Sequence, residues 1–166
     1  MSNKIILKKK IDFFKKKIII PGDKSISIRW VLIASLSHGI SKARNLLMSE
    51  DVIATIKAIK KLGAKVSYNN KICKIRGLGV DGYKYKKGIV INAQNSGTLG
   101  RLILGLLINT PVPIKIIGDK SLSKRDFRRI VDPLSKFGAN FTLHNGCGLP
   151  LTIKGSQKLK PIKFFE

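Results

Sequence analysis

A segment of twenty residues occurs twice in the chain, and this internal repeat constrains the fold more than any other feature. Residues 51–70 read DVIATIKAIKKLGAKVSYNN and residues 126–145 read DFRRIVDPLSKFGANFTLHN, an offset of 75 residues. Each copy opens with Asp, continues with apolar residues at helical spacing, reaches a Gly-Ala pair and then alternates. The repeat therefore predicts two copies of one unit, in which a helix stops at a glycine and a strand follows.

A second matched pair lies just upstream of the repeat. Residues 25–38 and residues 97–109 are almost wholly apolar after a polar start, which predicts two buried helices. Gly39 is expected to end the first helix, and the run Asn109-Thr110-Pro111 the second. Strands are predicted in the remaining gaps, at residues 17–20, 42–46, 65–68, 72–76, 88–92, 113–117, 140–143, 151–154 and 160–164.

The two repeat helices are expected to end differently. Gly63 follows the first helix directly and is predicted to be its C-terminal cap. Pro133 lies inside the second, where it removes a helical hydrogen bond and should kink or shorten the helix.

These elements predict an α/β (α+β) fold built from repeated βαβαββ units. The first unit is expected to span residues 16–84 and the second residues 85–157. An N-terminal segment, residues 1–15, precedes them, and residues 158–166 are expected to begin a third unit that is left unfinished. Loops between the elements are short, as in a compact domain.

Composition restricts the function classes without choosing one. The apolar stretches fall short of the roughly 20 residues that span a bilayer, and residues 1–15 lack the features of a targeting signal. The two cysteines have neither zinc-site spacing nor disulfide density, so a cytoplasmic location is expected. A net charge of +24 favours nucleic acid, anionic lipid or phosphorylated metabolites as partners, or simply reflects lysines that solvate the surface.

The first candidate site is the motif PGDKSISIR at residues 21–29, between a predicted strand and a buried helix. Ser25 and Arg29 share one helix face, and Lys24 lies at the N-terminal turn, where backbone N–H groups are free. Together these groups suit a phosphate or carboxylate. The motif is not a P-loop, because Asp23 stands where that motif needs glycine. Alternatively, Ser25 only caps the helix and the two basic side chains are solvated.

The second candidate site is Asn95-Ser96-Gly97-Thr98, with Arg101 one turn further on. Asn95 or Ser96 can cap the second buried helix, and Gly97 allows a ligand to approach the backbone closely. The motif therefore resembles another anion site. The alternative is an ordinary helix start with a glycine needed for packing.

The third candidate site is the basic loop GDKSLSKR at residues 118–125, which enters the helix that contains Arg128 and Arg129. Arginine offers a planar fork of donors that suits carboxylate or phosphate, so Arg125 could clamp a second acid group. A solvated run of charge is the alternative. No metal motif, Ser/His/Asp grouping or paired acid is recognisable, so the sequence offers binding groups without a proton-transfer residue.

In this order and spacing, the motifs resemble those of the 5-enolpyruvylshikimate-3-phosphate (EPSP) synthase family. The matching strings are PGDKSIS with Arg29, NLLMSEDVIATIKAIKKLGAKV, NSGTLGR, GDKSLSKR and DPLSKFGA, and the resemblance as a whole runs from about residue 18 to residue 155. The resemblance implies the enolpyruvyl transferase fold, an inside-out α/β barrel of two domains with three βαβαββ units each. This chain would then be an incomplete first domain.

The resemblance also implies two sets of substrate contacts. Lys24, Ser25 and Arg29 are expected to contact shikimate 3-phosphate. Phosphoenolpyruvate is expected to contact Lys24, Gly97 and Arg125, with Asn95 and Thr98 shaping the turn.

The implied reaction is transfer of the enolpyruvyl group of phosphoenolpyruvate to the 5-hydroxyl of shikimate 3-phosphate, with release of phosphate, in the shikimate pathway to chorismate and aromatic amino acids. The resemblance implies no metal or organic cofactor, no nucleic-acid or membrane partner, and a monomer when complete. The family's Ser-Ser-Gln loop, general-base aspartate and second-domain basic residues would lie beyond Glu166. The 166 residues alone are therefore expected to be an inactive fragment.

Departures from the family pattern concern three positions. Ile28 stands where His or Asn is usual, Trp30 replaces a smaller residue, and Asp126 follows Arg125 where proline is common. An acid beside the arginine is expected to weaken the field around it.

Two alternative functions remain open on the sequence. UDP-N-acetylglucosamine enolpyruvyl transferase shares the fold, but it lacks the PGDKS motif and has a loop cysteine that neither Cys73 nor Cys147 matches. A basic nucleic-acid-binding module would fit the charge, although RNA readers usually interleave aromatic residues with the basic patch. Aromatic residues are only 7% here, and none lies within the three motifs.

Overall fold

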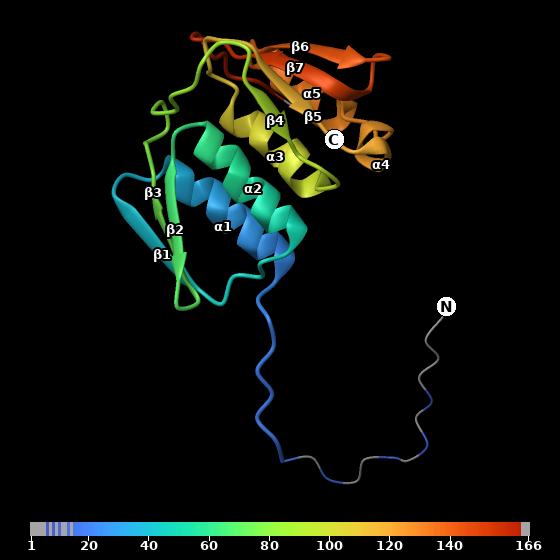
Figure 1. Cartoon of the computed structure of the whole chain (residues 1–166). Helices are drawn as coiled ribbons and strands as arrows, with labels where there is room; N and C mark the ends of the chain where they lie inside the picture. Colours follow the sequence, from blue (N-terminus) through green and yellow to red (C-terminus); the bar gives the residue numbers. More distant parts are fainter. Residues whose placement is uncertain (1–5, 7, 9, 11–12, 14, 164–166) are drawn as a thin grey trace.

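The computed structural model describes residues 6, 8, 10, 13 and 15–163, which form two β-sheets and a group of helices packed against them (Figure 1). The first sheet has the strand order β1-β3-β2, with all pairs antiparallel; its strands are β1 (Ile40–Arg44), β2 (Lys65–Asn69) and β3 (Ile72–Arg76). The second sheet has the order β4-β5-β7-β6, and only β4 and β5 are parallel; its strands are β4 (Val90–Asn92), β5 (Ile114–Ile117), β6 (Asn140–His144) and β7 (Gly148–Lys154).

Three longer helices pack against one another beside these sheets and start on the same side of the molecule (Figure 1). They are α1 (Lys24–Leu36), α2 (Glu50–Lys61) and α3 (Gly97–Leu106). Two shorter helices, α4 (Lys120–Ser123) and α5 (Arg128–Lys136), follow β5. No described helix is long and apolar enough to cross a membrane.

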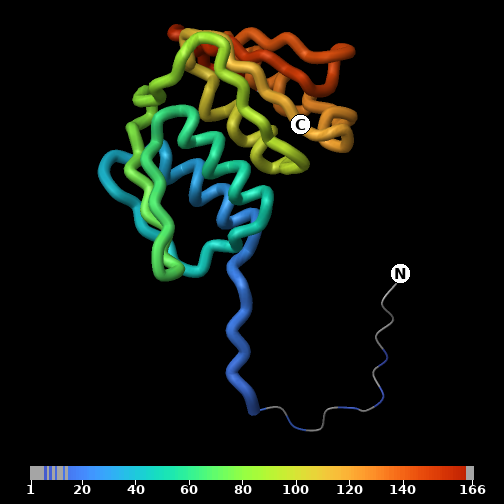
Figure 2. Tube along the Cα trace, in the orientation of Figure 1, coloured from blue at the N-terminus to red at the C-terminus, as the bar shows by residue number. Residues whose placement is uncertain are grey.

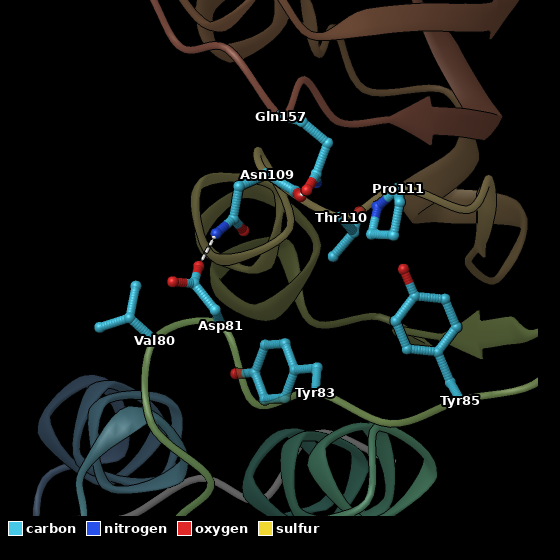
Figure 3. A pocket seen from close by; sticks show the side chains of 8 residues that line it. All are labelled: Val80, Asp81, Tyr83, Tyr85, Asn109, Thr110, Pro111 and Gln157. Atoms are coloured by element: carbon cyan, nitrogen blue, oxygen red, sulfur yellow. Dashed lines mark hydrogen bonds between the residues drawn. The ribbon is translucent and has the colours of Figure 1, made fainter.

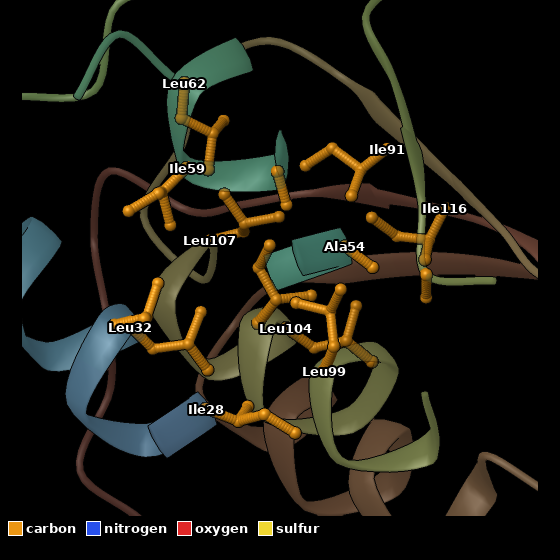
Figure 4. Close-up of a cluster of buried hydrophobic side chains, with 14 of the residues drawn as sticks. Ile28, Leu32, Ala54, Ile59, Leu62, Ile91, Leu99, Leu104, Leu107 and Ile116 are labelled. Carbon is orange, nitrogen blue, oxygen red and sulfur yellow. The ribbon is translucent and has the colours of Figure 1, made fainter. Parts of the chain in front are cut away.

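The core lies where the three helices meet the two sheets (Figure 4). Four side chains in this core are at most 2% exposed: Ile28 and Leu32 of α1, Ile59 of α2 and Leu104 of α3. Helix α2 buries one face and exposes its lysines, whereas α1 is apolar on most of its surface because it has neighbours on more than one side. Trp30 packs against the edge of this core, as expected of an aromatic residue in an apolar helix.

The internal repeat is confirmed at the level of backbone geometry. Strands β2 and β6 have the same length and are offset by the 75 residues seen in the sequence. Each forms an antiparallel hairpin with the strand that follows it, through the two residues Asn70-Lys71 in the first copy and the three residues Asn145-Gly146-Cys147 in the second. Asn70, Lys71, Asn145 and Gly146 all have positive φ, between 49° and 73°, as the two central residues of a type I′ turn require.

The two helices of the repeat end as predicted, whereas α1 and α3 end earlier than predicted, α3 at Leu106 rather than at Asn109-Thr110-Pro111. Gly63, at φ 101°, follows α2 and donates its N–H to the Lys60 carbonyl, as a C-terminal glycine does. Helix α5 contains Pro133 and has only 9 residues against 12 in α2, so the predicted shortening is confirmed. Helix α1 ends earlier than expected, at Leu36, because Ser37 already has an extended backbone; Gly39, at φ 83°, lies beyond that end.

Two predicted strands are wrong over their described residues. Residues 17–20 have no ladder partner, and Ile19 is 86% exposed where the chain runs away from the body of the protein (Figure 2). Residues 160–163 form no strand either, and residue 164 lies outside the described residues. Helix α4 was expected to be loop; Asp119 caps it by accepting the Leu122 N–H at 2.7 Å.

The predicted boundaries between units stay a prediction. All strands of the first sheet lie within residues 40–76 and all those of the second within residues 90–154, which agrees with two successive units. Of the proposed terminal segments, residues 1–5, 7, 9, 11–12, 14 and 164–166 lie outside the described residues.

Candidate anion-binding site

The first motif forms the start of α1. Asp23 is the N-cap, and its carboxylate accepts the Ile26 N–H at 2.7 Å, so the alternative that Ser25 caps this helix is wrong. Lys24 is the first helical residue, and Ser25 and Arg29 lie one turn apart on the same face, as predicted. Among the described residues, neither Ser25 nor Arg29 has a side-chain partner, so both are available to a ligand.

Lys24 has a partner that was not foreseen. Its Nζ lies 3.4 Å from Oδ2 of Asp51, the residue that opens the first repeat copy in the first turn of α2. The Lys24 side chain is 52% exposed, so the ion pair is weak and orients the ammonium more than it neutralises it. A doubly charged phosphate can therefore compete with Asp51 for Lys24.

The second and third motifs meet at Asn95. Its Nδ2 donates to Oδ2 of Asp119 at 2.8 Å, and its Oδ1 accepts a hydrogen bond from Nη2 of Arg125 at 3.3 Å. The backbone joins the same segments, because the Asp119 N–H donates to the Gln94 carbonyl at 2.7 Å. Asn95 thus connects two motifs, while Ser96 rather than Asn95 caps α3.

Gly97, the first residue of α3, is buried beneath two guanidinium groups. A Cβ atom at this position would lie 2.9 Å from Nη1 of Arg125 and 3.2 Å from Nη1 of Arg101. The glycine therefore makes room for two arginines at a helix N-terminus, in addition to the close backbone approach expected from the sequence. Two guanidinium groups and the positive end of the helix give this position a concentrated positive potential.

Neighbouring contacts hold these arginines in place. The Arg101 guanidinium lies 5.4 Å from the ring centre of the buried Phe127 and donates to the Asp126 carbonyl at 3.3 Å. The Asp126 carboxylate accepts the N–H of Arg128 at 2.8 Å and its Nε–H at 2.9 Å, and these bonds lower the pKa of Asp126. The expected weakening of the field at Arg125 by Asp126 is therefore offset by Arg128.

The structure brings the second and third motifs into contact and sets the first beside them. Helix α1 packs against α3, and both begin on the side of the molecule where α4 lies (Figure 1). No hydrogen bond or ion pair among the described residues joins the first motif to the other two. Thr98 lies partly exposed in the first turn of α3, next to Gly97. No described group of three His, Cys, Asp or Glu side chains could hold a metal ion.

A cavity of about 220 Å³ lies away from these motifs, where the segment before β4 meets the residues that follow α3 and β7 (Figure 3). Asn109 connects both sides, since it donates to Asp81 and its carbonyl accepts from Gln157. The Tyr83 hydroxyl hydrogen-bonds Ser35 in the last turns of α1 at 2.7 Å, and burial raises the pKa of Tyr83. The contact between Asn109 and Asp81 joins the two halves of the chain at the ends of α1 and α3 opposite the candidate site.

Comparison with known proteins agrees with this geometry. The family model described as EPSP synthase (3-phosphoshikimate 1-carboxyvinyltransferase) matches residues 8–166. The chain belongs to the EPSP synthase family. The resemblance predicted from the three motifs is therefore confirmed, in preference to the related UDP-N-acetylglucosamine enolpyruvyl transferases.

Individual EPSP synthases match nearly the whole chain. It is 39% identical over 159 residues to the 3-phosphoshikimate 1-carboxyvinyltransferase of Streptococcus suis, covering 95% of this chain and 37% of that protein. The chain is 42% identical over 145 residues to the same enzyme of Ruthia magnifica, and the match covers 87% of this chain and 33% of that protein. The EPSP synthase structure from Acinetobacter baumannii has a TM-score of 0.83 at 34% identity, covering 91% of this chain and 34% of that one. The chain thus spans about a third of the length of these relatives.

Proposed function

We propose that this chain supplies anion-binding groups of an EPSP synthase, which transfers the enolpyruvyl group of phosphoenolpyruvate to the 5-hydroxyl of shikimate 3-phosphate and releases phosphate. The observation that carries the proposal is the meeting of Asn95, Gly97 and Arg125, which come from two motifs distant in sequence. Family membership of residues 8–166 supports the same reaction.

Phosphoenolpyruvate is assigned to the start of α3 and to Lys24. Arg125 presents a planar fork to a carboxylate or phosphate, and the bond to Asn95 limits its rotation. The backbone at Gly97 and Thr98 begins a helix whose positive end favours an anion. Lys24 adds an ammonium group that is still available to an anion, because its ion pair with Asp51 is exposed and weak.

Shikimate 3-phosphate is assigned to the start of α1. Lys24, Ser25 and Arg29 offer an ammonium, a hydroxyl and a guanidinium on adjacent turns of one helix. A phosphate bound there would accept charge-assisted hydrogen bonds from both basic groups.

The two sites act by holding like-charged substrates side by side. Two polyanions repel each other in water, and fixed cations and helix ends remove this repulsion without reorganising during the reaction. The proposal involves no metal or organic cofactor and includes cytoplasmic location, a monomer, and two units at residues 16–84 and 85–157.

Titration of the 166-residue chain with phosphoenolpyruvate, followed by the fluorescence of its single tryptophan, Trp30, tests the assignment. Arg125→Gln removes a charge-assisted hydrogen bond worth roughly 1.5–3 kcal/mol, so the Kd should rise about ten- to a hundredfold. Arg129→Gln is the matched control, because it removes the same charge from an exposed position on α5. Equal losses in both variants would show that only net charge matters and would contradict the proposal.

A further inference from the structure

The solvent-facing side of the first sheet carries five basic side chains in register. Lys42 of β1 lies opposite Lys74 of β3, and Lys65 of β2 lies opposite Arg76 of β3. Arg44 extends the row along β1, and all five residues are exposed. Helices α1 and α2 cover the other side of this sheet, so the basic face points away from α3 and α4 (Figure 1).

These charges are not compensated within the described protein. The three strands contain no Asp or Glu, and none of the five basic side chains forms an ion pair or side-chain hydrogen bond with another described residue. Like charges directly opposite each other destabilise a sheet. The face therefore has a repulsion that a bound polyanion would relieve.

The spacing of the basic residues suits a linear polyanion. Residues two apart on a strand are separated by about 6.6–6.8 Å, and neighbouring strands by about 4.8 Å. The basic residues therefore form two rows, with Lys42 and Arg44 on β1 and Lys74 and Arg76 on β3. The spacing between the two residues within each row is similar to that of successive phosphates along a nucleic-acid strand. A shallow hollow of about 210 Å³ lies on this face, lined by Ile40, Lys65, Val66, Ser67, Lys74 and Arg76.

We propose that this face binds the phosphodiester backbone of nucleic acid without reading its bases. Sheets that recognise RNA bases stack them on aromatic side chains, and the outward-facing positions of β1, β2 and β3 have none. Contacts to phosphates alone hold a strand without sequence preference. The net charge of +24 also speeds the encounter with a polyanion.

This proposal is independent of the enzymatic one and departs from the expectation that the chain has no nucleic-acid partner. The absence of aromatic side chains argues against base recognition but leaves backbone binding open. A membrane surface is a poorer match, because this face lacks the Trp, Phe or Leu side chains that interfacial segments insert between lipids.

The test is fluorescence anisotropy of a labelled single-stranded oligonucleotide with the 166-residue chain over a range of salt concentrations. Binding should weaken linearly with the logarithm of salt concentration. Replacing both opposed lysines, as Lys42→Gln/Lys74→Gln, should make the slope less steep by roughly 1.4, since each lost phosphate contact changes it by about 0.7. Poly-dT and a mixed sequence should bind equally.

The matched control is Lys57→Gln/Lys60→Gln, which removes the same charge from exposed positions on α2. Its salt slope should equal that of the unmodified chain. The proposal is overturned if both double variants lose the same slope, if no binding occurs at low salt, or if phosphatidylserine vesicles compete more strongly than unlabelled oligonucleotide. Circular dichroism of each variant should be unchanged, because all four side chains are exposed.

Discussion

The side-chain amide of Asn95 can hydrogen-bond both Asp119 and Arg125 in only one of its two orientations. Its amide nitrogen donates to Asp119, and its amide oxygen accepts from Arg125. If the amide rotated, an N–H donor would face the Arg125 guanidinium, which has no acceptor. Asp119 is therefore a positioning residue that acts on Arg125 through Asn95.

Asp119→Asn tests this role. The new side chain can still cap α4 through its oxygen, but it presents an amide group where Asn95 needs an acceptor. Losing one hydrogen bond worth about 0.5–1.5 kcal/mol should weaken phosphoenolpyruvate binding roughly two- to tenfold, although the substitution makes the protein more positive. Titration and urea unfolding measure the two effects separately. Unchanged affinity would mean that Asp119 only caps the helix.

Gly97→Ala should separate binding from stability. The added Cβ would lie 2.9 Å from Nη1 of Arg125, so the guanidinium must move and phosphoenolpyruvate binding should weaken. Gly105→Ala is the control on the same helix, because no atom lies within 4 Å of its Cβ. The control should stabilise α3 by about 0.5–1 kcal/mol and leave the Kd unchanged. Equal affinities for the two alanine variants would exclude the proposed crowding.

At the scale of elements, the repeat shows how one hairpin is built twice with different turn residues. The second position of the turn is Lys71 after β2 and Gly146 after β6, and both have positive φ. A side chain with a Cβ pays a steric cost in this conformation, whereas glycine does not. The β2–β3 turn is therefore the more strained of the two.

Lys71→Gly should stabilise the chain by about 1 kcal/mol, because it relieves a left-handed conformation. Gly146→Lys should destabilise it by a similar amount, since the matched position is also at positive φ. Urea unfolding at neutral pH measures both. A destabilising Lys71→Gly would mean that Lys71 makes a stabilising interaction larger than its backbone strain.

At the scale of the whole molecule, three parallel helices separate two charged regions. The helix starts present the candidate anion site, and the first sheet presents the basic face on the other side (Figure 1). Four carboxylates near the site have partners: Asp23 caps α1, Asp51 pairs with Lys24, Asp119 holds Asn95, and Asp126 pairs with Arg128. These carboxylates thus position the helix starts and the basic side chains that are proposed to bind the substrates.

The 166-residue chain, which spans about a third of the length of its relatives, is expected to bind phosphoenolpyruvate without releasing phosphate. A colorimetric phosphate assay with both substrates should give the same rate as buffer alone. Release that depended on the enzyme and disappeared in Lys24→Ala would contradict this, because it would require a proton acceptor among these residues.

Local patterns in the sequence determined most of the secondary structure. Helical spacing and Gly63 predicted α2, alternation predicted strands at β2, β3, β6 and β7, and polar residues before apolar runs placed the first two motifs at the starts of helices. Such features depend on neighbours within about four residues, so the chain encodes them directly. The failed strand at residues 17–20 had the right composition, but a strand also needs a partner.

Only the tertiary structure decided which motifs meet. Arg125 reaches Asn95 across 30 residues, and Lys24 pairs with Asp51 on another helix. These contacts follow from how α1, α2 and α3 pack, which no short pattern specifies. Tertiary structure also makes neighbours of the like-charged side chains Lys42 and Lys74, through the register of β1 against β3. The sequence alone therefore determined the binding groups and their elements, while packing and strand register determined the distances between them.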